Sequence, residues 1–357
     1  MPIRFVISSL IFAATVWSAP PDPALWASRR GGVIEAINPE TLETISRIRL
    51  PGSVESVAAD PSGKLLFVAL PLRTDPIGCC ALYALDVPSL QLTFLTEPAL
   101  GATPTIDRVL TQRGNVGIEV FDSHTLTRLP TLKAPGVYGM RTSPDGRWLL
   151  GTTTFPGPSL DLFDLTQGNL VWRRAFEKNQ SLQGAWIGQE YCLLSVDAAG
   201  RRQLWSVSRD NPDLIEPIAV PLPNDSMPNC APIVQTMLAA AERLVIFEQF
   251  GHSLDRRRHC ATAPGGFVVV DPKTGATTDR LAASDHYRQM TASPDGRRLY
   301  GLDVGDIQWK QVRIVKLDAM SGATIRTKSL DSDVWFLTSG TIPQEMEGHL
   351  DLTALSR

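Results

Sequence analysis

The sequence lacks any strong excess of charge and, apart from its first residues, any long apolar run. Its 357 residues carry a formal net charge of −3, with acidic and basic residues interspersed. Binding to nucleic acid or to an anionic membrane surface relies on clustered Lys and Arg, so we expect no nucleic-acid partner. A membrane-spanning helix needs about 20 predominantly apolar residues, and we therefore expect no membrane insertion of the mature chain.

The motifs of the common catalytic and cofactor sites are also missing. The sequence contains no G-x-S-x-G, no P-loop, no G-x-G-x-x-G and no H-E-x-x-H. No two of the five cysteines are spaced C-x-x-C, which excludes covalent c-type haem and a zinc ribbon. His252, His259, Cys260 and His286 could be pictured around a metal ion, but their spacing fits no standard ligand motif. The sequence thus predicts no catalytic residues, no cofactor and no metal site.

The N-terminus is typical of an export signal. Arg4 is followed by an uncharged apolar stretch, Phe5–Trp17, and by a possible cleavage site between Ser18 and Ala19. We expect residues 1–18 to be a signal peptide and residues 19–30 an extended leader. The mature protein is then exported, periplasmic or extracellular. An uncleaved N-terminal anchor is the alternative, although the apolar stretch is short for a stable spanning helix.

A short turn signature recurs along almost the whole chain. It consists of Asp or Asn, two variable residues, Ser or Thr, and then Gly or Leu. Copies begin at Asn38, Asp86, Asp122, Asp271 and Asp318, with a near copy at Asp164 and a worn copy around 208–214. The first and last copies are 318 − 38 = 280 residues apart. Seven turns leave six intervals of about 47 residues, within the period of about 40–50 residues that β-propeller blades show.

A second turn completes a full repeat unit. It reads Asp60-Pro61-Ser62-Gly63 in the second unit and Ser-Pro-Asp-Gly at 143–146 and 293–296. Pro presets φ, while Asp and Gly tolerate turn geometry, so each block reverses the chain between two strands. The two turns divide a unit into four strands, expected in the second unit over 54–59, 64–70, 81–85 and 91–95.

Two stretches of the sixth and seventh units resemble a known repeat. Ser293–Tyr300, which reads SPDGRRLY, and Val268–Gly275, which reads VVVDPKTG, are similar to the YVTN-type β-propeller repeat. The resemblance spans residues 31–340 and is sharp in three or four units; the third unit, 102–132, is short and the fifth has lost both turn motifs. It implies an all-β, seven-bladed β-propeller of a family that includes exported proteins, lactonases and the propeller chains of amine dehydrogenases. The shared motifs are structural, so the resemblance implies no catalytic residue.

The two ends of the chain are expected to close the ring together. Residues 33–50 supply two strands before the first complete unit, and Val334–Ser339 and Leu350–Leu355 supply two more after the last one. These four strands predict a blade shared between the termini, which would remove an exposed sheet edge. We therefore expect residues 31–357 to form a single propeller domain.

The cysteines of an exported chain are expected to pair. Cys192 lies in an apolar segment and is predicted to be a buried, inert strand residue. Cys230 and Cys260 fall in loops that flank the same unit at the same end, which favours a disulfide between them. The adjacent Cys79 and Cys80 either form a vicinal bridge or leave one thiol free.

Recognition is expected at one end of the ring. Both tight turns of a unit lie at the same end, so the longer loops 71–80, 221–230 and 249–265 emerge together at the other, where binding residues concentrate. The last of these loops contains Arg256, Arg257, Arg258 and His259. Guanidinium groups suit an anionic contact, whereas the competing interpretation is a solvated loop paired with its own acids.

The sequence predicts a non-catalytic binding or scaffold module for a protein or small ligand. The alternative is an enzyme or enzyme subunit, either a lactonase-like hydrolase or a propeller chain of a quinone-dependent amine dehydrogenase. Only the family resemblance supports that alternative, and fold does not imply function.

Overall fold

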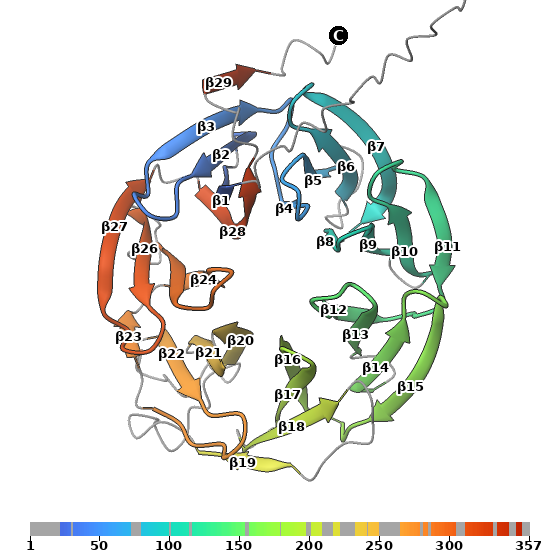
Figure 1. The fold of residues 1–357 in the computed structure, drawn as a ribbon, viewed down its shortest axis with the longest axis vertical. Coiled ribbons are helices and arrows are strands. Elements are labelled where there is room, and N and C mark those ends of the chain that lie inside the picture. The colour runs from blue at the N-terminus through green and yellow to red at the C-terminus, as the bar shows by residue number, and fades with distance from the viewer. Residues whose placement is uncertain are drawn as a thin grey trace, which may run out of the picture.

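The computed structural model describes most of the chain as seven antiparallel sheets arranged in a ring (Figure 1). The described residues are 22–29, 31–72, 80–99, 101–113, 116–153, 157–178, 180–197, 201–208, 217–221, 233–240, 242–249, 265–278, 281–284, 287–304, 311–330, 334–342 and 348–351. These residues form strands and turns and no helix. The predicted all-β, seven-bladed propeller is confirmed.

Blades are numbered here from the N-terminus, and each runs from an inner strand at the ring centre to an outer strand (Figure 1). Blade 2 comprises β4 (Ser56–Ala59), β5 (Leu65–Pro71), β6 (Cys80–Asp86) and β7 (Gln91–Ala99). Blade 3 comprises β8 (Thr103–Pro104), β9 (Arg108–Arg113), β10 (Gly117–Asp122) and β11 (Arg128–Leu132). Blade 4 comprises β12 (Val137–Thr142), β13 (Trp148–Thr153), β14 (Ser159–Asp164) and β15 (Asn169–Ala175). Blade 5 comprises β16 (Ser181–Ile187), β17 (Glu190–Val196), β18 (Arg202–Ser208) and β19 (Ile218–Val220). Blade 6 comprises β20 (Ile233–Ala240), β21 (Arg243–Gln249), β22 (Gly265–Val270) and β23 (Leu281–Ser284). Blade 7 comprises β24 (Tyr287–Ala292), β25 (Arg298–Asp303), β26 (Val312–Asp318) and β27 (Thr324–Leu330).

Blade 1 is shared between the two ends of the chain, as predicted, but in different proportions. Its inner strand is β28 (Val334–Ile342), followed outwards by β1 (Asp22–Arg29), β2 (Val33–Ile37) and β3 (Thr44–Arg49). The N-terminal part therefore supplies three strands instead of two, because residues assigned to a leader form β1. β1 pairs with β28 along its whole length, from Asp22 opposite Ile342 to Arg29 opposite Val334. The second C-terminal strand, β29 (Gly348–Asp351), lies parallel to β3 at the outer edge instead of inside the blade.

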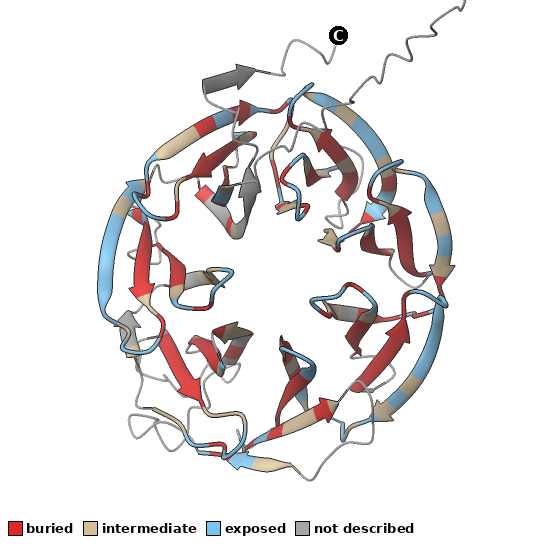
Figure 2. Cartoon of the chain, viewed as in Figure 1, coloured by how far each residue is buried: buried red, intermediate tan, exposed pale blue. Residues whose placement is uncertain are grey.

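The apolar core is divided among the contacts between neighbouring blades. The described residues form seven hydrophobic clusters, and each joins side chains of two adjacent blades. Trp26 of β1, for example, is fully buried and packs in the cluster between blades 1 and 2. Burial is greatest in the two middle strands of each blade, which are largely red in Figure 2, and least in the outer strands, which are mostly tan and pale blue; the inner strands are mixed. Fully burying a Val, Leu, Ile, Phe or Met side chain contributes about 1.5–3 kcal/mol to stability. The apolar contacts between blades therefore provide the main stabilisation of the ring.

The recurring turn signature forms the hairpin between the third and fourth strands of its blade. Its fifth residue donates its backbone N–H to the carbonyl of the first, at 2.8 Å from Leu42 to Asn38 and 3.0 Å from Gly322 to Asp318. That fifth residue adopts a positive φ, 58° at Leu42 and 70° at Gly322. Gly adopts a positive φ without steric strain, whereas Leu adopts it at a cost in conformational energy. Leu42 is buried between blades 7 and 1, which offsets the penalty with apolar packing.

The two irregular units depart from the repeat as their sequences predict. In the short third blade the inner strand β8 has only two residues, Thr103 and Pro104. In the fifth blade a tight turn at Gly188, whose φ is 56°, joins Ile187 to Glu190 in place of a Pro-containing turn. Both blades keep four strands, so changes in the turns leave the ring intact.

Candidate functional site

The strand directions divide the ring into a turn end and a loop end. Within each blade the four strands alternate in direction, so the first-to-second and third-to-fourth connections share one end. The second-to-third connections and the links between blades share the other. The chain's longest connection between strands leaves β21 at Gln249 and returns at Gly265, at this loop end. The assignment of the long loops to one end follows from the observed topology.

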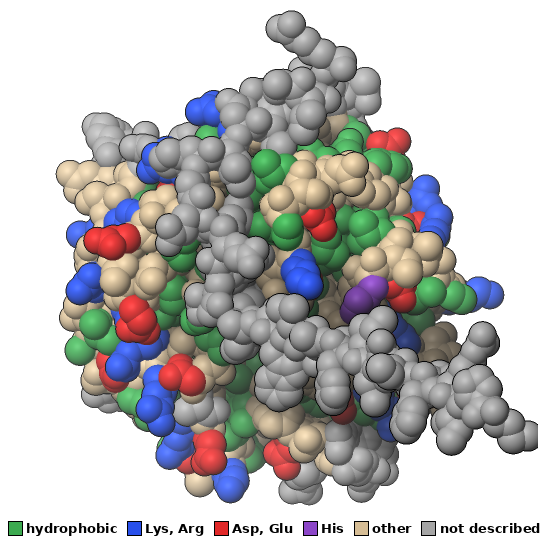
Figure 3. Space-filling view, turned by 45° about the horizontal axis from the view of Figure 1, so that its top comes forward, with side chains coloured by type: hydrophobic (Ala, Val, Ile, Leu, Met, Phe, Trp, Pro, Cys, Tyr) green, Lys and Arg blue, Asp and Glu red, His purple; other side chains and the backbone are tan. Residues whose placement is uncertain are grey.

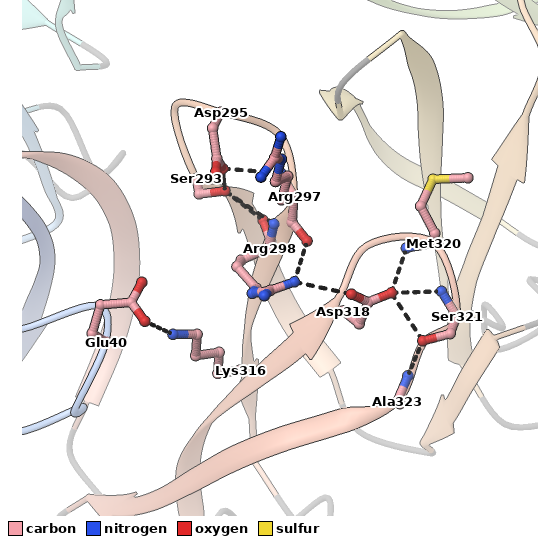
Figure 4. Close-up of polar contacts among 10 residues, drawn as sticks. All are labelled: Glu40, Ser293, Asp295, Arg297, Arg298, Lys316, Asp318, Met320, Ser321 and Ala323. Atoms are coloured by element: carbon pink, nitrogen blue, oxygen red, sulfur yellow. Dashed lines mark hydrogen bonds and ion pairs between the residues drawn. The ribbon is translucent and has the colours of Figure 1, made fainter.

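The turn end is built from short, locally bonded turns. In blade 7, Asp318 Oδ1 accepts hydrogen bonds from the backbone N–H of Met320 at 3.2 Å and of Ser321 at 3.0 Å (Figure 4). Its other oxygen, Oδ2, accepts from Arg298 at 2.9 Å. These bonds hold the pKa of Asp318 below its ordinary value, with the backbone N–H of Ser321 as the largest cause. The carboxylate is thus held by its own hairpin through one oxygen and by Arg298 of β25 through the other.

The charges on the face drawn in Figure 3 are mixed. Red and blue side chains alternate across its lower left, and green apolar side chains gather at its upper right. Such interspersed charge gives no long-range attraction for an ion of one sign. Specific recognition therefore has to come from local geometry.

Buried ionisable side chains lie at the loop end. Six blades each bury one such group near the loop end of a second or third strand, and none is more than 3 % exposed: Glu35, Glu119, Asp161, Arg202, Glu248 and Asp303. Burying an isolated charge is costly, so each requires a partner. The partners come from neighbouring strands, and the resulting ion pairs tie together the strand ends from which the loops leave.

Blades 1 and 3 use the same three-residue arrangement. Glu35 of β2 lies between Arg29 of β1 and Arg47 of β3, with Arg47 Nε 2.7 Å from the carboxylate. Glu119 of β10 lies in the same way between Arg113 of β9, at 2.9 Å, and Arg128 of β11. One buried carboxylate therefore links the second, third and fourth strands of its blade.

Blade 4 extends the arrangement into a hydrogen-bond chain that reaches the loop end. Arg173 of β15 binds Asp161 through two nitrogens, at 2.8 and 2.6 Å. Ser159 Oγ donates to Asp161 at 3.1 Å and lies 2.7 Å from Thr153 Oγ1, which also reaches the carbonyl of Gly157 at 3.2 Å. The chain fixes the ends of β13 and β14 on both sides of their loop.

An ion pair between blades 5 and 6 lies next to the longest loop. Arg202, the first residue of β18, contacts Glu248, the second-to-last residue of β21, and both side chains are completely buried. Breaking such a pair by removing one partner is strongly destabilising, because the other charge stays buried. This pair therefore fixes the loop end of β21, the strand that precedes residues 250–264.

The residues singled out from sequence for recognition lie outside the described part of the chain. This applies to Arg256, Arg257, Arg258 and His259, and to Cys79, Cys230 and Cys260 of the expected disulfides. Cys80 is described as the buried first residue of β6. These assignments remain predictions.

Cys192 behaves as its sequence context predicts. It is buried on β17, and burial raises the pKa of its thiol to about 12, so the reactive thiolate is not formed at neutral pH. Trp148, Trp172, Trp186 and Trp205 pack in one cluster between blades 4 and 5, which agrees with a core role.

Sequence reasoning missed the buried carboxylates, although part of their signal was present. Glu35, Glu119 and Asp161 each stand three residues before the Asn or Asp that opens the turn of their blade. Alternation along a strand predicts that this position faces a neighbouring blade, where a charge demands a partner. The pairing of Arg202 with Glu248 had no such local signal, because the two residues belong to different blades.

Two absences apply to the described residues. No group of three or more His, Cys, Asp and Glu side chains within them could hold a metal ion. No helix among them has the length and apolar character needed to cross a bilayer.

Comparison with known proteins reveals fold similarity alone. The sequence matches no protein-family model and no curated protein. Among solved structures, the β-propeller domain of Cps50 (Swd1) from Myceliophteria thermophila gives a TM-score of 0.57 at 12% identity, covering 83% of this chain and 95% of that one. The dihydro-heme d1 dehydrogenase NirN, in complex with DHE, gives 0.53 at 13% identity, covering 90% of this chain and 75% of that one. Apo AztD from Citrobacter koseri gives 0.50 at 13% identity, covering 90% and 98%.

These similarities agree with the seven-bladed architecture. The three proteins include a dehydrogenase and a domain without a stated activity, so the shared fold does not select a function. A function for this protein therefore has to be inferred from the loop end of its own ring.

Proposed function

We propose that this protein is an exported, non-catalytic β-propeller that binds a protein or a small ligand through the loop end of its ring. The observation that supports the proposal is the buried Arg202–Glu248 pair, because it anchors the strand from which the longest loop leaves. A scaffold that is already ordered loses little entropy when a partner docks on its loops.

The contacts to that partner are assigned to Arg256, Arg257 and Arg258, with His259 beside them. Guanidinium groups form paired hydrogen bonds with planar carboxylates and with phosphates. The proposed partner therefore presents an anionic group to this loop. Export of the mature chain, inferred from residues 1–18, would place the partner outside the cytoplasm.

The test is an affinity pull-down from the exported fraction of the native host. The wild-type protein is compared with a variant carrying Ala at Arg256, Arg257 and Arg258. A matched control carries Ala at Lys64, Lys273 and Arg297, three exposed cations of the turn end. Both variants lose three positive charges, so only the position of the loss differs.

The expected result is a partner recovered by the wild type and the control and lost from the loop variant. Equal recovery by all three proteins would overturn the assignment to these arginines. If no protein recovers a partner, the binding function itself fails. The wild type is then assayed with lactones, amines and divalent metal ions, which tests the enzymatic alternative.

A further inference from the structure

The outer edges of the blades differ in how they are protected against added strands. An open edge strand presents unpaired backbone groups, and natural proteins guard such edges with proline, charged side chains, short length or a covering segment. Here β11 contains Pro130 and β19 and β23 have only three and four residues, while β7 contains Pro98 close to its end and exposes Phe94 (53%) before it. β3 is covered by β29.

β27 keeps full length but carries cations along its edge. Arg326 donates to the backbone carbonyl of Thr41 at 2.9 Å, and Lys328 Nζ donates to Thr44 Oγ1 at 2.8 Å. Its exposed Ile325 stands alone between Thr324 and Arg326. The apolar surface of this edge is therefore one isolated side chain.

β15 has no proline, no charged side chain and, among the described residues, no covering strand over its first half, and its register against β14 shifts at Val171. It is seven residues long, contains no proline, and places Leu170, Val171 and Trp172 in succession. Leu170 is 40% and Val171 47% exposed, and the strand shows its pale outer surface in Figure 2. Among the described residues no strand pairs with its outer edge.

Two cations, Arg174 and Lys178, and one exposed acid, Glu177, lie beside this edge. Arg174 lies over the ring of Trp205, with the guanidinium carbon 4.9 Å from the ring centroid, and pairs with no carboxylate of the described residues. A guanidinium that stacks on a ring through its face keeps N–H donors for a carboxylate. Lys178, shortly after the strand, is also exposed.

The chain contains its own example of an added strand. β29 pairs in parallel with β3, from Gly348 opposite Ser46 to Asp351 opposite Arg49. The outer edge of a blade in this ring is therefore geometrically open to another extended segment. Strand addition uses backbone bonds for affinity and alternate side chains for selectivity.

We propose that the outer edge of β15 is a docking edge for an extended segment of a partner protein in which apolar and acidic residues alternate. The backbone of the segment pairs with β15, its apolar side chains cover Leu170 and Val171, and an acidic side chain reaches Arg174. This edge lies on the outer wall of the ring, so the proposal stands independently of the loop-end function.

A synthetic peptide of alternating Val and Glu is the probe, and a peptide of alternating Val and Lys is its counterpart. Binding to the full chain is measured by fluorescence anisotropy, with hydrogen exchange to locate the protected amides. Two variants test the edge: Val171→Lys, which adds a guarding charge, and Arg174→Glu, which reverses the contact. Ile325→Lys is the matched control, since Ile325 follows Asp318 by the same seven residues that separate Val171 from Asp164.

The expected result is that the Val/Glu peptide binds, protects the amides of β15, and binds Val171→Lys and Arg174→Glu at least about tenfold more weakly, a loss of about 1.4 kcal/mol. Ile325→Lys should bind like the wild type. No binding, equal binding of the Val/Lys peptide, protection at another edge, or equal loss in Ile325→Lys would each overturn the proposal. All three positions are solvent-accessible, and urea unfolding of each variant shows whether the ring is intact.

Discussion

The Asp and Asn side chains that open the recurring turns bond mainly to the backbone of their own hairpins, whereas the buried charges at the loop end bond across strands and, for Arg202 and Glu248, across blades. Asp318 reaches backbone groups two and three residues away and remains partly exposed. Glu248 reaches Arg202 in another blade, and both are fully buried. The turn end is therefore specified largely by local sequence and repeats from blade to blade, while the loop end depends on pairing between strands and, for Arg202 and Glu248, between blades.

The largest loss of stability is expected from a deletion that opens the ring, because the turn end and the loop end both depend on ring closure. Deleting residues 334–357 removes β28, the inner strand to which β1 pairs along its length. The ring then cannot close, and we expect the cooperative thermal transition to be lost in near-ultraviolet circular dichroism. Deleting only residues 343–357 removes β29 but keeps β28, and should leave a cooperative transition. A wild-type transition in the longer deletion would show that closure does not depend on β28.

The next largest loss of stability is expected when a buried ion pair of the loop end is broken. Glu248→Leu leaves Arg202 buried without its carboxylate, and we expect the free energy of unfolding to fall by about 3–5 kcal/mol in urea denaturation. The double variant Arg202→Met with Glu248→Leu removes both charges and should recover most of the loss. If the double variant is as unstable as the single one, packing rather than charge explains the cost.

A matched change at the turn end should cost less. Asp318→Ala removes the acceptor of two backbone N–H groups in a partly exposed hairpin, and we expect a loss of about 1–2 kcal/mol. Asp318→Asn keeps an oxygen in the same place and should cost less than Ala. Asn38 already shows this arrangement in blade 1, where its Oδ1 accepts from Glu40 at 2.8 Å and Thr41 at 3.0 Å. A loss with Ala as large as that of Glu248→Leu would remove the distinction between the ends.

The turn end should also respond to acid. Backbone N–H groups lower the pKa of Asp122, mainly through Thr125, and of Asp318, mainly through Ser321. A lowered pKa in the folded state means that the stabilisation is fully present above the ordinary value of 3.8 and is lost as pH falls through the folded pKa. Unfolding free energies between neutral pH and pH values below 3.8 should therefore fall less steeply for Asp318→Asn than for the wild type. Equal slopes would contradict the proposed linkage.

The same distinction explains what the sequence could predict. The five-residue turns at Asn38 and Asp318 are local, so their spacing was enough to predict seven blades and closure by both termini. The division of blade 1 was predicted wrongly, because 22–29 lies within the proposed leader 19–30 and carries no turn motif. Its role depends on pairing with β28, more than 300 residues away in sequence. Arg202 and Glu248 were missed for the same reason, since only the assembled ring brings them together.

The smallest effect on stability is expected at the residues assigned to recognition. Ala at Arg256, Arg257 and Arg258 should change the free energy of unfolding by no more than about 0.5 kcal/mol, as for surface substitutions away from buried networks. A large loss of stability would mean that these arginines belong to the structural ion pairs of the loop end, and any loss of binding would then have a structural cause. Unchanged stability with lost binding would separate the two roles. The buried pairs would then hold the strand ends, and the loops between them would carry the contacts.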